Sequence, residues 1–231
     1  MAWVARRITT LTLLVAAMLV SFGLILGCAI ATGELLALAE RPDGSTAIDG
    51  SITSWFVAHR TVALTTVARL LSTLGSQTVL IPVTAIVTVA LLGRRRFVLG
   101  GLLLATWGGT LGLYSVTKYV VHRTRPPTDL WLTDVTRTAS FPSGHATQSL
   151  GMFLALVFVG AVWLPKARWP ARAIAIALAI GVGWSRVYLG VHWATDVGAG
   201  WVLAAAWLTI VLWLARAAQS IQARRQGNPA V

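Results

Sequence analysis

Residues 97–126 read FVLGGLLLATWGGTLGLYSVTKYVVHRTRP, and this stretch decides the fold. Its first 21 residues carry no charge, and Lys118, Arg125 and Pro126 then follow within nine positions. The hydrocarbon core of a bilayer is about 30 Å thick and needs about 20 apolar residues in a helix that crosses it. The stretch therefore predicts a membrane-spanning helix that ends in a cluster of cations.

The rest of the chain repeats this alternation of long apolar runs and short polar ones. Of its 231 residues, 56% are hydrophobic and 11% are charged, which leaves too little polar surface for a soluble globule of this size. We expect an all-α, polytopic membrane protein with six transmembrane helices in one bundle. No Pro-, Gly- or Ser-rich linker divides the chain, so residues 1–231 are expected to form a single domain. The six expected spans are residues 8–32, 75–92, 97–117, 146–164, 172–189 and 193–214.

The segment between the first two spans, residues 48–74, has a different pattern. Apolar side chains such as Ile52 and Phe56 recur there at helical spacing, while Asp49 and Arg60 fall among the polar positions. A helix with one apolar and one polar face suits the boundary between lipid and water. We therefore expect an amphipathic helix along the membrane interface.

The lysines and arginines indicate the orientation, because loops rich in these residues tend to stay in the cytoplasm. Most of the 19 lie at alternate ends of the expected spans: Arg6, Arg7, Arg94, Arg95, Arg96, Lys166, Arg168, Arg172, Arg216, Arg224 and Arg225. Both termini are therefore expected on the cytoplasmic side of the cell membrane. Several cations break this rule and indicate a local anion-binding site, among them Lys118, Arg123, Arg125, Arg137 and Arg186.

The start of the chain has a second interpretation. Arg6 and Arg7 before an apolar run also suit a cleaved signal peptide, and the sequence around Cys28 faintly resembles a lipoprotein cleavage site. We favour a membrane span, because the run is long for a signal peptide and its removal would break the alternation of charge.

Two further polar clusters lie where apolar runs begin or end. In Pro142-Ser143-Gly144-His145, Ser143 can cap the helix that follows, and the free N–H groups at that helix start can bind an oxyanion. In Ser185-Arg186 with His192 and Asp196, the last two residues are four apart and share a face if a helix begins there. The Asp196 carboxylate can then accept a hydrogen bond from Nδ1–H of His192, which leaves Nε2 of the histidine available as a nucleophile.

Each cluster alone also has a plain structural explanation. Lysine and arginine at helix ends anchor to lipid head groups, serine caps ordinary helices, and His192 with Asp196 can be a structural pair. Placing ionisable groups at the membrane costs free energy, however, and this cost favours a functional explanation over a structural one. The loops after the third and fifth spans are two crossings apart, so we expect all three clusters on one face, which the charge pattern makes the extracytoplasmic one.

Together, the three clusters resemble the complete signature of the type 2 phosphatidic acid phosphatase family. The matching runs are Lys118-x6-Arg125-Pro126, Pro142-Ser143-Gly144-His145 and Ser185-Arg186-x5-His192-x3-Asp196. The resemblance covers residues 118–196 and implies an enzyme that hydrolyses a phosphate or diphosphate of a lipid. It does not distinguish between four lipid substrates: polyprenyl diphosphate, phosphatidylglycerol phosphate, phosphatidic acid and diacylglycerol pyrophosphate.

The resemblance also implies a role for each signature residue. His192 would be the nucleophile that forms a phosphohistidine, Asp196 would orient it, and His145 would be the general acid. Phosphate oxygens would be bound by Lys118, Arg125, Ser143, Gly144 and Arg186. Such a site is consistent with phosphoryl transfer in general, which depends mainly on positioning and charge neutralisation.

The charges of the clusters argue against a catalytic metal. Three fixed cations exceed the one carboxylate, so a divalent ion would be repelled, and we expect neither a metal nor another cofactor. The cations are dispersed among apolar spans, so we expect no nucleic-acid partner. Two alternatives remain: a transporter or lipid-binding protein that only recognises anionic head groups, and a phosphotransferase that passes the same phosphohistidine to an alcohol. The oligomeric state is left open.

Overall fold

The structure is a computed structural model that describes residues 2–135 and 139–225, with side chains described for 12–135 and 139–220. Every regular element in these residues is a helix, as the sequence predicts. The elements are α1 (Ala2–Leu38), α2 (Ala47–Ala58), α3 (Val62–Leu74), α4 (Gln77–Gly93), α5 (Phe97–Val120), η1 (Thr128–Leu130), α6 (Gly144–Gly160), η2 (Pro165–Ala167), α7 (Arg168–Tyr188) and α8 (Ala194–Arg225).

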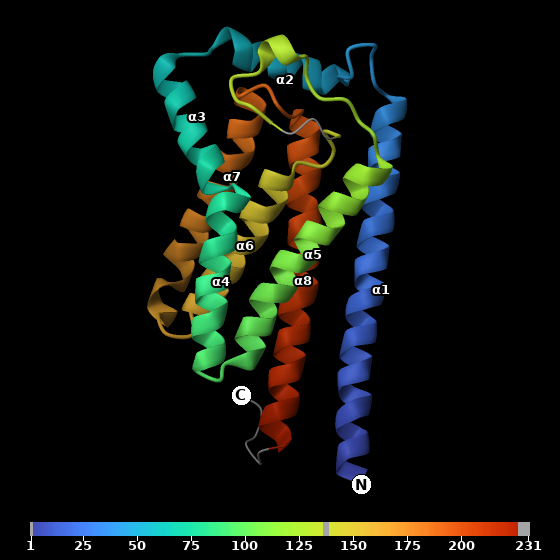
Figure 1. The fold of residues 1–231 in the computed structure, drawn as a ribbon, viewed down its shortest axis with the longest axis vertical. Coiled ribbons are helices and arrows are strands. Elements are labelled where there is room, and N and C mark those ends of the chain that lie inside the picture. The colour runs from blue at the N-terminus through green and yellow to red at the C-terminus, as the bar shows by residue number, and fades with distance from the viewer. Residues whose placement is uncertain (1, 136–138, 226–231) are drawn as a thin grey trace.

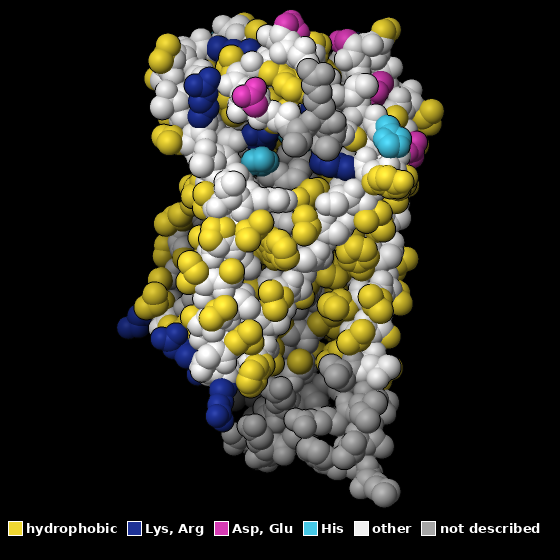
Figure 2. Space-filling view, in the orientation of Figure 1, with side chains coloured by type: hydrophobic (Ala, Val, Ile, Leu, Met, Phe, Trp, Pro, Cys, Tyr) yellow, Lys and Arg dark blue, Asp and Glu magenta, His cyan; other side chains and the backbone are white. Residues whose placement is uncertain are grey.

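The long helices run along one axis and form a bundle (Figure 1). The start of α1 and the end of α8 lie at the lower end of this bundle, whereas α2 lies across the upper end. Hydrophobic side chains cover its middle, and charged side chains gather toward the two ends (Figure 2). An outer apolar belt between charged ends is the surface that a bilayer requires.

The expected membrane fold is confirmed, but the expected number of spans is confirmed only in part. Within the described residues, five helical segments are long and apolar enough to cross a membrane: Thr12–Leu38, Val62–Gly93, Phe97–Val120, Pro165–Tyr188 and Ala194–Ser220. The fourth expected span, residues 146–164, corresponds to α6, which has 17 residues. A shorter helix at this place has a physical reason, because α6 begins among the polar groups of the site and is enclosed by α5, α7 and α8.

Residues 48–74 form two helices instead of one. Thr46 and Thr61 accept the backbone N–H groups of Asp49 and Leu64 and so cap the starts of α2 and α3. Only α2 lies across the bundle; α3 runs on toward α4 (Figure 1). The outer face of α3 is apolar, with Val62 87% exposed. A location of these helices at the membrane interface stays a prediction.

A tight turn joins α7 to α8 and positions the third polar cluster. Gly190 has φ +76, a conformation that side-chain-bearing residues rarely adopt, and a Cβ there would lie 2.2 Å from the carbonyl oxygen of Leu130. Arg60 fixes the same turn by donating hydrogen bonds to the carbonyls of Tyr188 and Leu130. The chain can therefore reverse within a few residues and bring His192 back beside Arg186.

The main hydrophobic core lies below the polar end, between α4, α5, α6 and α8. Trp207 of α8 is buried there and donates its indole N–H to the carbonyl of Ala105 at 2.9 Å. The largest fully buried side chains of this core include Leu103, Leu113 and Met152. The core thus gives the upper, polar part of the bundle a rigid base.

Candidate active site

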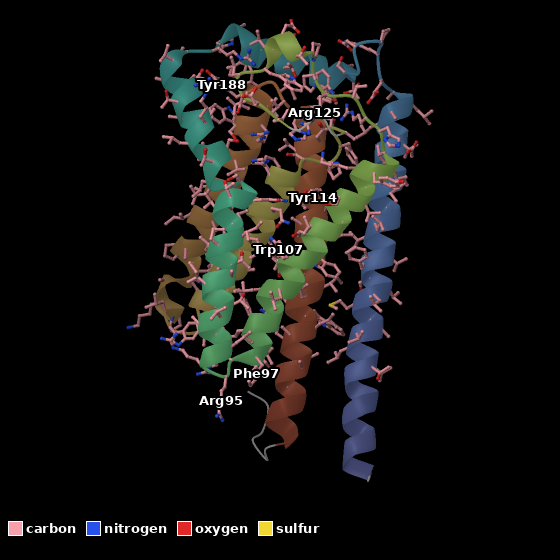
Figure 3. The ribbon with its side chains drawn as sticks, in the orientation of Figure 1. Arg95, Phe97, Trp107, Tyr114, Arg125 and Tyr188 are labelled. Carbon is pink, nitrogen blue, oxygen red and sulfur yellow. The ribbon has the colours of Figure 1, made fainter. Side chains whose placement is uncertain are left out.

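A cavity of about 950 Å³ opens at the upper end of the bundle, above this core. Six residues of the three polar clusters line it, and they come from α5, α6, α7 and the connections between them: Lys118, Arg125, Gly144, His145, Arg186 and His192. The expected convergence of the clusters at one end of the molecule is therefore observed. Figure 3 shows Arg125 at this end and Arg95, from the basic α4–α5 connection, at the other.

The first cluster contributes two cations held by backbone carbonyls. Nζ of Lys118 donates hydrogen bonds to the carbonyl oxygens of Ala139 and Ser140 at 2.6 and 2.9 Å. Nη1 of Arg125 donates to the carbonyl of Val191 at 2.6 Å and lies 3.2 Å from Nε2 of His192. These carbonyl groups orient two basic side chains at the wall of the cavity.

The second cluster starts α6. Ser143 is fully buried and its Oγ caps the helix by accepting the N–H of Ala146, as predicted, while its own N–H binds the backbone carbonyl of Asp196 at 3.0 Å. Its side chain does not line the cavity, whereas Gly144 and His145 do. A Cβ on Gly144 would come within 3.1 Å of the ring of Tyr114, so glycine leaves room at this wall.

The third cluster contributes Arg186 near the end of α7. Its Nη1 donates a hydrogen bond to Oγ of Ser72 on α3, and its buried Nε has no hydrogen-bond partner among the residues that the structure describes. A buried guanidinium N–H without a partner is costly unless a ligand accepts it. Arg186 lines the cavity, so this donor is available to an anion there.

His192 and Asp196 form a close pair, but not on one turn of helix. Helix α8 begins at Ala194, after His192, because Asp196 folds back and accepts the N–H of Trp193 at 2.9 Å, as a capping residue does. The same oxygen, Oδ2, lies 3.2 Å from Nδ1 of His192 and also accepts Oγ–H of Ser140. The predicted pairing is therefore present, and capping produces it where we expected helical periodicity.

The surroundings of His192 favour its neutral form. Burial lowers the pKa of its imidazole well below the ordinary value, and the nearby cations Lys118, Arg125 and Arg186 lower it further. Arg125 Nη1 can donate only to an unprotonated Nε2, and Nδ1–H can then donate to Asp196. In this arrangement the lone pair on Nε2 of His192 faces Arg125, one of the cations of the cavity.

One of the cations assigned to the anion site lies elsewhere, and the position of another is not tested. Arg123 does not line the cavity; its guanidinium is fully buried and pairs with Glu40, Asp49 and Asp196. Arg137 lies outside the described residues. Asp49, which the helical pattern placed on a polar face of an interfacial helix, is likewise fully buried.

Sequence analysis also missed residues that orient the site. Ser72 holds Arg186, Ser140 holds Asp196, and Thr195 binds Arg123 through Oγ1 at 2.6 Å. They are ordinary hydroxyl residues that occupy no signature position of the three motifs, so no local sequence signal marks them. Within the described part of the chain, no three His, Cys, Asp or Glu side chains are grouped so as to hold a metal ion.

Comparisons with known proteins agree with this site. A model of the PAP2 superfamily matches residues 97–220. The chain is 37% identical to an undecaprenyl-diphosphatase of Sulfolobus acidocaldarius over 61% of this chain and 65% of that protein. It is 31% identical to phosphatidylglycerophosphatase B of Bacillus subtilis over 73% of this chain and 84% of that one. The crystal structure of a transmembrane PAP2-type phosphatidylglycerolphosphate phosphatase from Bacillus subtilis superposes with a TM-score of 0.70, at 28% identity, over 80% of this chain and 93% of that one.

The chain belongs to the PAP2 superfamily, a family that includes membrane lipid phosphatases. The resemblance seen in the three motifs is thereby confirmed, and so is the expected assignment as an enzyme of the phosphatase class.

Proposed function

We propose that the protein hydrolyses a phosphate or diphosphate head group of a membrane lipid through a phosphohistidine on His192, without a metal ion. The observation that carries this proposal is the composition of the cavity wall. The imidazoles of His145 and His192 and three basic side chains meet there from α5, α6, α7 and the connections between them, although Lys118 and His192 are 74 positions apart. The cations alone would suit a protein that only binds anionic head groups, but the buried His192–Asp196 pair would then have no role.

Each group has a role in the proposed reaction. Nε2 of His192 attacks phosphorus and forms an N–P bond as the bond from phosphorus to the leaving oxygen breaks. His145 gives its proton to that oxygen and then takes one from the water that hydrolyses the phosphohistidine. Asp196 holds Nδ1–H throughout and favours the imidazolium that develops during attack.

The phosphate oxygens are bound by Lys118, Arg125 and Arg186, together with N–H groups at the start of α6. When the substrate enters, Arg125 turns its N–H from Nε2 of His192 to a phosphate oxygen, which frees the lone pair for attack. Ser143 contributes through its cap and its bond to the Asp196 carbonyl, which keep Gly144 at the cavity wall. These cations spread the charge of the transition state, and this is the main requirement of phosphoryl transfer.

The relatives indicate the substrate class. The names of the two curated relatives specify an isoprenoid diphosphate and a phosphatidylglycerol phosphate, so both are candidates here. The cavity lies where the apolar belt of the bundle ends, so a lipid tail can stay in the bilayer while its head group reaches His192. We further propose one domain over residues 1–231 with six crossings, cytoplasmic termini and an active site on the extracytoplasmic face of the cell membrane.

One assay tests the function. Purified protein in detergent should release inorganic phosphate from undecaprenyl diphosphate, phosphatidylglycerol phosphate or phosphatidic acid, and His192→Ala should be inactive on all three. A His192→Ala protein as active as the parent would overturn the covalent mechanism. Analysis of products with an added alcohol identifies a phosphotransferase, since its phosphate would appear on the alcohol.

Two further measurements address the metal and the orientation. Activity should survive exhaustive chelation with EDTA; loss of activity that only an added divalent metal restores would contradict the metal-free mechanism. A single cysteine placed at Asp129, an exposed residue of η1, should react with a membrane-impermeant thiol reagent added to intact cells, and one placed at Arg95 should react only after lysis. For this experiment Cys28 is replaced with serine first.

A further inference from the structure

Beside the cavity, and separate from it, lies a second group of charges centred on Arg123. The guanidinium is fully buried and each of its nitrogens binds a different carboxylate. Nε lies 2.9 Å from Glu40, Nη2 lies 2.7 Å from Asp49, and Nη1 lies 2.7 Å from Oδ1 of Asp196. Asp49 and Asp196 are fully buried as well. Removing an arginine and its carboxylate partners from water costs free energy, and this cost indicates that the group serves a function.

We propose that Arg123 is a positioning residue for catalysis, which fixes the carboxylate of Asp196 so that only Oδ2 faces His192, and that Asp49 holds Arg123 in place. This proposal rests on the proposed function of the His192–Asp196 pair. It adds two residues to the catalytic site. Arg123 lies between Lys118 and Arg125 in the sequence, and Asp49 belongs to α2. Asp49 lies outside residues 97–220, which match the family model.

The contacts of Asp196 show how Arg123 acts. Oδ1 accepts from Arg123, while Oδ2 accepts from Ser140 and Trp193 and lies 3.2 Å from Nδ1 of His192. Because both oxygens are occupied, the carboxylate cannot rotate without losing a charge-assisted hydrogen bond. The imidazole then meets one defined acceptor, which fixes its tautomer and the direction of Nε2.

Asp49 fixes Arg123 through a short network. Its Oδ1 accepts the N–H of Thr195 at 3.0 Å, and its Oδ2 accepts Oγ1–H of Thr195 and of Thr46, each at 2.8 Å. Burial raises the pKa of Asp49, but the hydrogen bonds from Thr195 and Arg123 outweigh it, and the pKa is lowered. Asp49 is therefore ionised, caps the first turn of α8, and links α2 to the residue next to Asp196.

Arginine is required here because of its shape. A lysine has one nitrogen and cannot reach carboxylates on three sides, whereas the planar guanidinium contacts all three in one plane. Burial lowers the pKa of Arg123, yet Asp196 and Asp49 outweigh this effect and raise it. A neutral residue at this position would leave Asp196 free to turn and two buried carboxylates without their cation.

The test compares Arg123→Gln and Arg123→Lys with the parent in the phosphate-release assay. Arg123→Gln should lower kcat at least ~tenfold, the loss expected for a charge-assisted hydrogen bond. KM should change less than about threefold, because Arg123 does not contact the phosphate. The acidic limb of the pH profile should move to higher pH, since the loss of a buried positive charge beside the site makes uptake of a proton there less unfavourable. Arg123→Lys should recover part of kcat by restoring charge.

Milder variants keep the test decisive if Arg123→Gln does not fold. Thr195→Val removes the hydroxyl shared by Arg123 and Asp49 at almost constant volume, and Asp49→Asn removes one charge. Both should lower kcat about three- to tenfold. Arg69→Gln, an exposed arginine that binds the carbonyl of Leu132, is the matched control and should leave the pH profile unchanged.

The outcomes separate this proposal from the proposed function. An active parent with an inactive His192→Ala supports the function whatever Arg123 does. Parental kcat and an unchanged acidic limb in folded Arg123→Gln, or parental kcat in both Thr195→Val and Asp49→Asn, would overturn the role of Arg123 alone. A loss of thermal stability with unchanged kcat per folded molecule would show a purely structural role and also overturn it.

Discussion

Nδ1 of His192 lies 3.2 Å from Oδ2 of Asp196, although the helix that carries Asp196 begins after the histidine. The contact exists because Asp196 turns back over the first turn of α8 to accept the N–H of Trp193. One carboxylate therefore caps a membrane helix and orients an imidazole. This double use depends on the spacing from His192 to Asp196, since a longer spacing would carry the carboxylate along the helix axis and away from the ring.

The first prediction concerns this carboxylate. Asp196→Asn should lower kcat by about 10²- to 10⁴-fold with little change in KM, because the amide no longer favours the Nδ1–H tautomer or the imidazolium of the transition state. Phosphate release at saturating lipid measures this change. Asp129→Asn, a carboxylate on the exposed side of η1, is the control and should keep parental activity. An Asp196→Asn enzyme within threefold of the parent would refute the orienting role.

A second prediction concerns binding. Arg186→Gln should raise the inhibition constant of inorganic phosphate about tenfold or more, because its partnerless Nε and its charge serve the anion. Ser72→Ala should have a smaller effect in the same direction, since Ser72 only holds Arg186 through Nη1. Inhibition of lipid hydrolysis by phosphate gives both constants. Unchanged inhibition in Arg186→Gln would place the anion elsewhere.

The pH dependence provides a third prediction. Burial and the surrounding cations lower the pKa of His192 from its ordinary value of about 6.5, so the neutral nucleophile persists as pH falls through 6.5. Activity is therefore present above the lowered pKa and is lost only below it. Arg125→Gln removes one of these cations and should move the acidic limb of kcat/KM to higher pH. The ionisable groups that face His192 are Lys118, Arg125, His145, Arg186 and Asp196.

That profile is measured in parent and Arg125→Gln with the same lipid, so the titration of the substrate cancels in the comparison. An acidic limb that stays in place would mean that Arg125 does not affect the ionisation of His192.

A fourth prediction concerns the turn before His192. Gly190→Ala should destabilise the fold by about 1–3 kcal/mol, because alanine at positive φ is strained and its Cβ would meet the carbonyl of Leu130. Gly198→Ala is the matched control: it lies in α8 with nothing within 4 Å of an added Cβ and should not lower stability. Thermal unfolding in one detergent compares the two. Equal midpoints would contradict the assigned role of Gly190.

Sequence reasoning succeeded where the signal was local. Apolar runs such as residues 97–117 predicted helices, since a bilayer demands a fixed length of uncharged chain. Motif spacing predicted the residues at the cavity, since Lys118, His145 and His192 stand at the ends of those runs. Both features can be read from a few neighbouring residues.

It failed where a partner lies far along the chain. Arg123 was assigned to the anion site, yet it pairs with Asp49, which is 74 residues away. Asp49 was assigned to a solvent-facing side of an interfacial helix, because periodicity alone does not distinguish a wet polar face from one that meets a buried cation. The division of residues 48–74 into α2 and α3 was missed for a similar reason, since Thr61 is a modest cap signal.

The central claim, a phosphohistidine on His192, is tested most directly by trapping it. Protein mixed with lipid substrate and quenched within milliseconds is digested and analysed by mass spectrometry under alkaline conditions, which preserve phosphohistidine. The account predicts one phosphate on Nε2 of His192 in the parent and none in His192→Ala. Phosphate on another residue, or parental turnover by His192→Ala with no trapped intermediate, would contradict it.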